Sequence, residues 1–197
     1  NGVDVTLFRP PTPAERASAR IALDVAPGKP VLLYIGRFVA KKGLPLLHSL
    51  ARDFPEGTWL FAGDGQIPPE AWNLPNVRVY RDRERESLRE LVWASDLLLL
   101  PSESEGFPLV VQEALASGLP SLVTSDIAEG YPPSRAALLL ESLGEGAHER
   151  WLARLRALAN GTETVPSAAD LAAFAQEHWN WDRAVATYRE IIEELEP

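Results

Sequence analysis

The sequence contains no cysteine and only three histidines, His48, His148 and His178. The absence of cysteine excludes a disulfide framework, a thiolate metal site and a cysteine nucleophile. Histidines this few and this scattered give little support to a zinc site. For His48, on a predicted helical face, packing or a surface position is expected, and not a catalytic role. We therefore expect no bound metal ion.

Long apolar runs and methionine are absent as well. Apolar runs such as Leu97 to Leu100 are far shorter than the ~20 residues that a membrane span needs, and the N-terminus has no signal-peptide pattern. These absences predict a cytoplasmic protein. Because the 197 residues include no methionine and begin at Asn1, we take the chain to be a fragment or an excised domain.

Basic residues are outnumbered by acidic ones. The chain has 19 Lys and Arg against 28 Asp and Glu, a formal net charge of −9, with 46% hydrophobic residues. Nucleic acid and anionic lipid require clustered cations, so the acidic balance argues against both partners. Any anionic ligand must be held by a local basic pocket.

Short aliphatic segments alternate with amphipathic ones from residue 31 onward. This alternation predicts an α/β fold, a Rossmann-like, doubly wound parallel sheet of about six strands with a C-terminal helical segment. We expect one domain over 1–197, with a linker and lead-in helix at 1–30, a βαβ core at 31–142 and helices at 143–197. Strands are predicted at 31–36, 58–63, 76–80, 96–101, 119–124 and 136–141. Helices are predicted at 14–25, 43–54, 84–94, 108–117, 145–159, 167–178 and 181–195.

Two cations follow the first predicted strand, at the edge where an open parallel sheet binds ligands. Arg37 comes directly after Gly36, and Lys42 precedes Gly43 and a predicted helix. Cations beside a helix N-terminus suit a phosphate or diphosphate, and a solvated surface turn is the alternative. The spacing is not that of a P-loop. No G-x-G-x-x-G occurs, so a nicotinamide or flavin fingerprint is missing.

Two glutamates, Glu105 and Glu113, flank the start of the helix predicted after the fourth strand. Gly106 permits close backbone approach, and Pro108 suits the first helical position. Carboxylates at this spacing lie on the order of 10 Å apart, too far to share a proton. The spacing favours a site in which the two carboxylates bind opposite ends of one elongated ligand. The alternative is that both are exposed acidic residues at the end of a helix, without a ligand.

These blocks resemble a known family. The stretch 101–120, with its two glutamates, closely resembles the E-x7-E signature of retaining glycosyltransferases of family GT4, in the donor-binding half of the GT-B fold. Segments 1–10, 36–43, 61–65 and 181–183 are similar, in order and spacing, to that domain's linker, diphosphate loop, second glycine loop and C-terminal segment. The resemblance covers essentially the whole chain.

The resemblance implies a role for each residue of the site. Arg37 and Lys42 are expected to contact the donor diphosphate and offset charge on the departing nucleotide, without a metal ion. Glu113 is expected to accept hydrogen bonds from the ribose, and Glu105 to face the transferred sugar. Arg37, Lys42 and Glu105 are thus the expected catalytic residues, and the donor-binding set adds Gly36, Gly63, Gly65, Gly106, Phe107, Leu109, Val110 and Glu113. No cofactor is expected beyond the nucleotide-sugar substrate.

The function implied is transfer of a sugar from a nucleoside-diphosphate sugar to an unidentified acceptor hydroxyl. The acceptor half would precede Asn1, so we expect the isolated chain to be inactive in transfer. A peripheral membrane acceptor would be reached through that missing half. A nucleotide-binding or interaction module without transfer, and an epimerase or phosphorylase of the same architecture, are the alternatives.

Two segments depart from the family pattern or from its expected use. After 124–126 the family usually continues with a glycine and a Pro-Glu pair, whereas this chain has a different sequence at 127–134. The run 81–86, where the family places backbone that contacts the base, alternates in charge and predicts a solvated face.

The final predicted helix carries one apolar stripe. Family resemblance suggests that this helix crosses back to the acceptor half, so we expect its distal part to be exposed, mobile or packed on a neighbouring molecule. Burial against the sheet is the alternative. The stripe consists of Trp181, Val185, Tyr188, Ile192 and Leu195.

Overall fold

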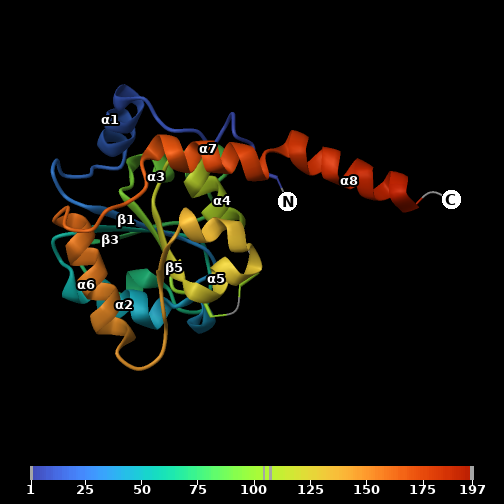
Figure 1. Ribbon diagram of the computed structural model, residues 1–197. Coiled ribbons are helices and arrows are strands. Elements are labelled where there is room, and N and C mark those ends of the chain that lie inside the picture. The colour runs from blue at the N-terminus through green and yellow to red at the C-terminus, as the bar shows by residue number, and fades with distance from the viewer. Residues whose placement is uncertain (1, 104, 107, 196–197) are drawn as a thin grey trace.

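The computed structural model describes residues 2–103, 105, 106 and 108–195, and the side chains up to residue 193. Within these residues six parallel strands form one sheet in the order β3-β2-β1-β4-β5-β6 (Figure 1). The order reverses beside β1, because β2 and β4 are its two neighbours. The predicted fold class, a doubly wound parallel sheet, is confirmed. The strands are β1 (Val31–Ile35), β2 (Thr58–Ala62), β3 (Val77–Tyr80), β4 (Leu97–Leu100), β5 (Ser121–Thr124) and β6 (Leu139–Glu141).

Helices cover both faces of this sheet. Helix α2 packs with α6 on one side, while α1 packs with α3 and α4 with α7 on the other (Figure 1). Strands β2, β4 and β5 are buried along their whole length, which explains the nearly unbroken apolar sequence of β2 and β4. The helices are α1 (Pro13–Ala22), α2 (Leu44–Asp53), α3 (Arg85–Ala94), α4 (Leu109–Ala116), α5 (Ser125–Gly130), α6 (Ala147–Ala159), α7 (Ala168–Trp179) and α8 (Trp181–Leu195).

The helices match the predicted ranges to within three residues, except for α5, which the sequence analysis missed. Three 3₁₀ turns also escaped prediction: η1 (Ala40–Lys42), η2 (Pro69–Trp72) and η3 (Pro132–Ala136). Helix α1 stops at Ala22 instead of residue 25, because Asp24 adopts a left-handed φ of +50°. Of the two positions expected for His48, packing or surface, the structure shows packing, since its ring stacks on Trp72 with centroids 4.8 Å apart. None of the described helices is long and apolar enough to cross a membrane.

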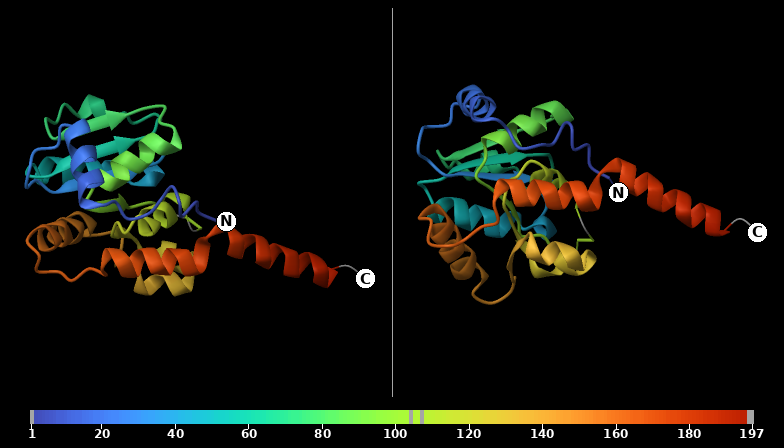
Figure 2. Two further views of the ribbon diagram at one scale, coloured as in Figure 1. Left: turned by 90° about the horizontal axis from the view of Figure 1, so that it is seen from above. Right: turned by 45° about the horizontal axis from the view of Figure 1, so that its top comes forward.

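Helix α8 extends away from the rest of the chain (Figure 1 and Figure 2). The predicted exposure of the distal part of its apolar stripe is confirmed, because Tyr188 is 58% and Ile192 57% exposed, and Trp181 at its start is 50% exposed as well. The side chain of Leu195 lies outside the described residues. The chain start lies beside the first turn of α8, where the Val3 amide donates to the Trp179 carbonyl at 2.6 Å. Both ends of the chain therefore leave the sheet from the same corner.

Candidate functional site

The loops that follow β1 and β2 are locked together at the carboxyl edge of the sheet. The Phe38 amide donates to the Asp64 carbonyl at 2.7 Å, and the Ile67 amide donates back to Phe38 at 2.9 Å. Gly63 has φ +143°, and a Cβ there would lie closer than 3.0 Å to Gly36. Gly65 has φ +154° and packs equally tightly on the Phe38 backbone. Only glycine fits these two positions, which explains the glycine loop at 63–65.

A cavity of about 340 Å³ opens beside this pair of loops. It lies where β1, β2 and β3 end, next to the point at which strand order reverses, and ligands of such sheets bind in this position. Three predicted site residues, Gly36, Arg37 and Gly63, line it. The lining is completed by Ile35, Ala62, Asp64, Asp82, Arg83 and Leu88.

The run 81–86, predicted to be a solvated face, also reaches the site. Its residues are mostly exposed as expected. However, Asp82 and Arg83 line the cavity, and Arg81 binds both Asp64 and Glu70 while its guanidinium lies 5.5 Å from the Phe38 ring. The solvated-face interpretation is therefore incomplete, because this run braces the second glycine loop. The alternating charges of this run gave no indication that Arg81 would pair with Asp64 and Glu70, which precede it by more than ten residues in the sequence.

Lys42 and Glu105 form an ion pair that joins the loops after β1 and β4. Both side chains are largely buried, at 17% and 15% exposure, and the fully buried Ser102 hydroxyl donates to the same Glu105 oxygen at 2.9 Å. The backbone reinforces the junction, since the Glu103 amide donates to the Lys41 carbonyl at 2.8 Å. The structure thus brings together two of the three predicted catalytic residues.

Gly43 allows that junction to close. It begins α2 with φ +82°, and a Cβ on it would lie closer than 3.0 Å to Pro101. A side chain at this position would push the loop of Lys42 away from the loop of Glu105.

Arg37, the third predicted catalytic residue, stands apart from this ion pair. Its side chain is exposed and forms no ion pair with any residue that the structure describes. Its backbone is fixed by the Tyr34 hydroxyl, which donates to the Arg37 carbonyl at 2.8 Å. Burial, reinforced by the negative charge of Glu105, raises the pKa of Tyr34, so the phenol stays protonated as this bond requires. Arg37 is therefore available to an anion in the cavity.

The N-terminus of α4 is open. The amides of Leu109 and Val110 donate to no acceptor among the described residues, whereas the Val111 amide is bound by the Pro108 carbonyl at 3.1 Å. Gly106 is exposed and has open space where a side chain would begin. The predicted contribution of Phe107 falls outside the described residues. Unpaired amides at a helix N-terminus attract an anion.

Glu113 lies one turn further along α4 and is only 14% exposed. Its Oε1 accepts a hydrogen bond from Nη2 of Arg85 at 2.7 Å. Burial raises the pKa of Glu113, and the positive charge of Arg85 partly offsets that rise. Arg85 was not among the predicted site residues, because nothing in the sequence links α3 to α4.

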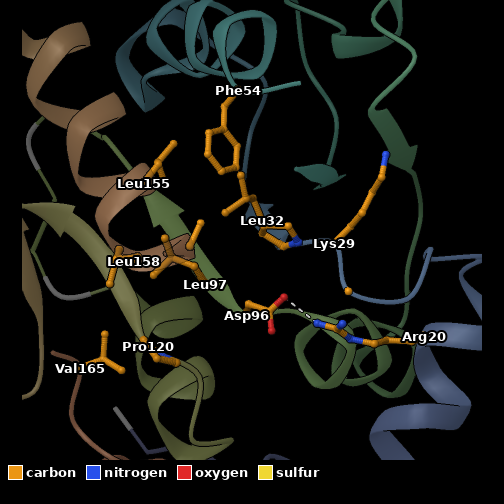
Figure 3. Close-up of a pocket in the computed structure, with 13 residues that line it drawn as sticks. Arg20, Lys29, Leu32, Phe54, Asp96, Leu97, Pro120, Leu155, Leu158 and Val165 are labelled. Carbon is orange, nitrogen blue, oxygen red and sulfur yellow. Dashed lines mark hydrogen bonds and ion pairs between the residues drawn. The ribbon is translucent and has the colours of Figure 1, made fainter. Parts of the chain in front are cut away.

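A second cavity, of about 330 Å³, lies at the opposite edge of the sheet, where β1 and β4 begin (Figure 3). Its walls are mainly apolar. One acidic residue, Asp96, lines this cavity. It already forms ion pairs with Arg16 and Arg20 at 2.6 Å each, and it accepts a hydrogen bond from the Val31 amide at 2.8 Å. Lys29 also lines this cavity, and it forms no ion pair with any described residue. The other edge is the better candidate for an anionic ligand, because there Arg37 and the α4 amides that have no acceptor among the described residues accompany the carboxyl ends of the strands.

The sequence matches a known family. The family described as glycosyl transferases group 1 matches residues 15–133, more than half of the chain. The chain is 28% identical to the sulfoquinovosyl transferase of Arabidopsis thaliana over 95% of its own length and 38% of that protein. It is 30% identical to the D-inositol 3-phosphate glycosyltransferase of Mycobacterium marinum over 97% of its length and 44% of that protein. The chain therefore spans less than half of these two relatives.

Solved structures share the fold over nearly the whole chain. The Anabaena protein HepE in complex with UDP-glucose has a TM-score of 0.80 at 21% identity, covering 99% of this chain and 56% of that one. The sucrose-phosphate synthase of Thermosynechococcus elongatus has a TM-score of 0.79 at 23% identity, covering 98% and 51%. The family model matches more than half of the chain, including most of the sheet, and the solved structures share its fold. The chain therefore belongs to the glycosyl transferases of group 1.

Proposed function

We propose that this chain is the donor-binding half of a retaining, metal-independent GT4 glycosyltransferase that uses a nucleoside-diphosphate sugar. The carrying observation is that the Arg37 side chain and the α4 amides without an acceptor among the described residues both lie at the carboxyl edge of the sheet. An anionic diphosphate suits such a set of donors. The E-x7-E spacing of Glu105 and Glu113 supports the same assignment.

The chemistry asks the site to stabilise a leaving group. As the bond between the sugar's anomeric carbon and the diphosphate oxygen breaks, its electron pair stays on the diphosphate. The acceptor oxygen bonds to the anomeric carbon, and its proton passes to the departing diphosphate. Arg37, Lys42 and the α4 amides are the groups that would offset the new negative charge. Lys42 must exchange its Glu105 partner, at least in part, for a phosphate oxygen. The Glu105 carboxylate is then able to contact the transferred sugar.

A preceding half would complete the enzyme. The relatives are more than twice as long as the aligned chain, and the chain start lies beside the projecting α8. We expect the acceptor to bind to that other half, and the apolar stripe of α8 to pack on it. Transfer activity is then a property of the whole protein, and the 197-residue chain alone should bind donor without transferring sugar.

Titration calorimetry with nucleoside diphosphates provides the first test. We expect at least one of UDP, GDP and ADP, or their sugar conjugates, to bind with no metal added and with unchanged affinity in excess EDTA, because protein cations and amides supply the positive charge. Absence of binding by all of them at millimolar concentration would contradict the proposal. Binding that disappears with EDTA would contradict only its metal independence.

The full-length protein separates transfer from the alternatives. Release of free nucleoside diphosphate together with a new glycoside, in the anomeric configuration of the donor, is the result expected of a retaining transferase. Donor binding without any turnover would instead favour the binding module, and donor isomerisation without transfer would favour the epimerase.

Helix α8 offers a test of the proposed interface between halves. In the isolated chain we expect amides 188–193 to exchange hydrogen much faster than those of β1 and β4, because an isolated helix of this length is marginally stable in water. Hydrogen-exchange mass spectrometry of the dilute monomer measures this difference. Protection equal to that of the two strands would mean that α8 is stabilised within this chain and needs no preceding half.

A further inference from the structure

Glu113 has one cationic partner among the described residues, and it comes from a different helix. The Arg85 guanidinium, at the first position of α3, holds Oε1 of Glu113 at 2.7 Å. Oε2 of the same carboxylate accepts no hydrogen bond from any described donor. One oxygen is therefore occupied by the protein, and the other is available to a ligand.

Arg85 also contacts the N-terminal segment of the chain. Its guanidinium lies 5.5 Å from the ring centroid of the fully buried Phe8. Asp4, from the same N-terminal segment, also feels its positive charge. Arg85 is half exposed, at 52%, whereas Glu113 is largely buried. The arrangement brings a solvent-accessible cation to an acid that is mostly removed from water.

A buried carboxyl group without a cation tends to hold its proton. Burial raises the pKa of Glu113 and Arg85 works against the rise, so the ion pair widens the pH range over which Glu113 is ionised. The ionised form accepts hydrogen bonds on both oxygens, whereas the protonated form offers one fewer acceptor site. Ribose hydroxyls need such an acceptor.

We propose that Arg85 is a positioning residue that holds Oε1 of Glu113 and leaves Oε2 as the acceptor for the ribose hydroxyls of the donor. The proposal rests on the donor-binding function argued above. Arg85 acts only through Glu113. The charged groups that bear on this pair from the packed elements are Arg85 itself on α3 and Asp4 in the N-terminal segment.

The test combines the variant Arg85→Gln with two measurements. First, the ¹³C chemical shift of the Glu113 carboxyl, followed against pH without ligand, should show its pKa raised by about one unit in the variant. Second, calorimetry with the nucleoside diphosphate that binds the wild type should show an affinity loss that approaches about tenfold at the acid end and shrinks toward pH 8. Arg85→Lys should restore most of both properties.

Arg89→Gln provides the matched control. It removes an arginine one turn further along α3, whose guanidinium lies over Trp93 at 4.5 Å and has no acidic partner among the described residues. Neither the Glu113 titration nor the pH profile of binding should change in this variant, so a general effect on α3 would be recognised.

Two outcomes overturn the proposal in different ways. If Arg85→Gln leaves the Glu113 titration and the pH profile unchanged while Glu113→Gln still weakens nucleotide binding, the positioning role is wrong and the donor-binding function stands. If the titration shifts as expected but the wild type binds no nucleotide, the donor-binding function fails, and with it the assignment of Oε2 to a ribose.

Discussion

Replacing Lys42 with alanine should weaken the binding of nucleoside diphosphates by about 10- to 150-fold, the equivalent of about 1.5–3 kcal/mol for a charge-assisted hydrogen bond. The bare nucleoside should lose little, because it carries no phosphate for the ammonium group to meet. The low exposure of Lys42 strengthens the effect, since a bond made away from water is less well replaced by solvent. Calorimetry with the nucleoside and its diphosphate measures both losses.

Two companion variants make that result specific. Lys41→Ala removes the neighbouring lysine, whose exposed side chain has no acidic partner among the described residues, and should leave both ligands nearly unaffected. Glu113→Gln should give the reverse pattern and weaken the nucleoside as much as the diphosphate. If Lys42→Ala weakens nucleoside and diphosphate equally, the assignment of Lys42 to the phosphates is wrong.

The variant Gly43→Ala should lower the free energy of unfolding by about 2–5 kcal/mol. About 1–2 kcal/mol comes from placing an alanine at a left-handed φ, and about 1–3 kcal/mol from forcing a methyl group into packed surroundings. The packed neighbour is the Pro101 backbone, which the new methyl would approach closer than 3.0 Å. Chemical denaturation of the purified chain gives this difference in free energy directly.

Gly28→Ala isolates the packing contribution. Gly28 has φ +77°, nearly the same as the +82° of Gly43, but no atom lies within 4 Å of the position where its Cβ would stand. We expect this variant to lose only about 1 kcal/mol, from backbone strain partly offset by the stiffer unfolded chain. Equal losses at the two glycines would show that the loops after β1 and β4 do not depend on the close approach.

The strands were the most predictable part of the structure. Leu97–Leu100 is buried on both sides, so its sequence must be apolar at every position, and such a run between turns is readable without the fold. Helix α5 was missed for the opposite reason. Its six residues are too few to show a helical period, and Ser125 and Asp126 are residue types that also favour turns.

The site was predictable in its residue types but not in their pairing. The positions of Lys42, just before α2, and of Glu113, one turn into α4, could be read from the sequence. Their partners could not, since Glu105 is 63 residues from Lys42 and Arg85 is 28 residues from Glu113. Which side chains meet at one edge of a sheet depends on strand order, and strand order is a property of the folded chain.

The Lys42–Glu105 pair also bears on how fast a donor can be captured. A chain with net charge −9 repels an anionic nucleotide at long range, and a lysine already neutralised by a carboxylate provides no compensating attraction. Attraction of an anion to the site would then come from Arg37, which has no ion-pair partner among the described residues, and little from Lys42. The site would then select among anions only after they have bound, because a phosphate must compete with the Glu105 carboxylate for the Lys42 ammonium group. Anions that cannot displace Glu105 would dissociate.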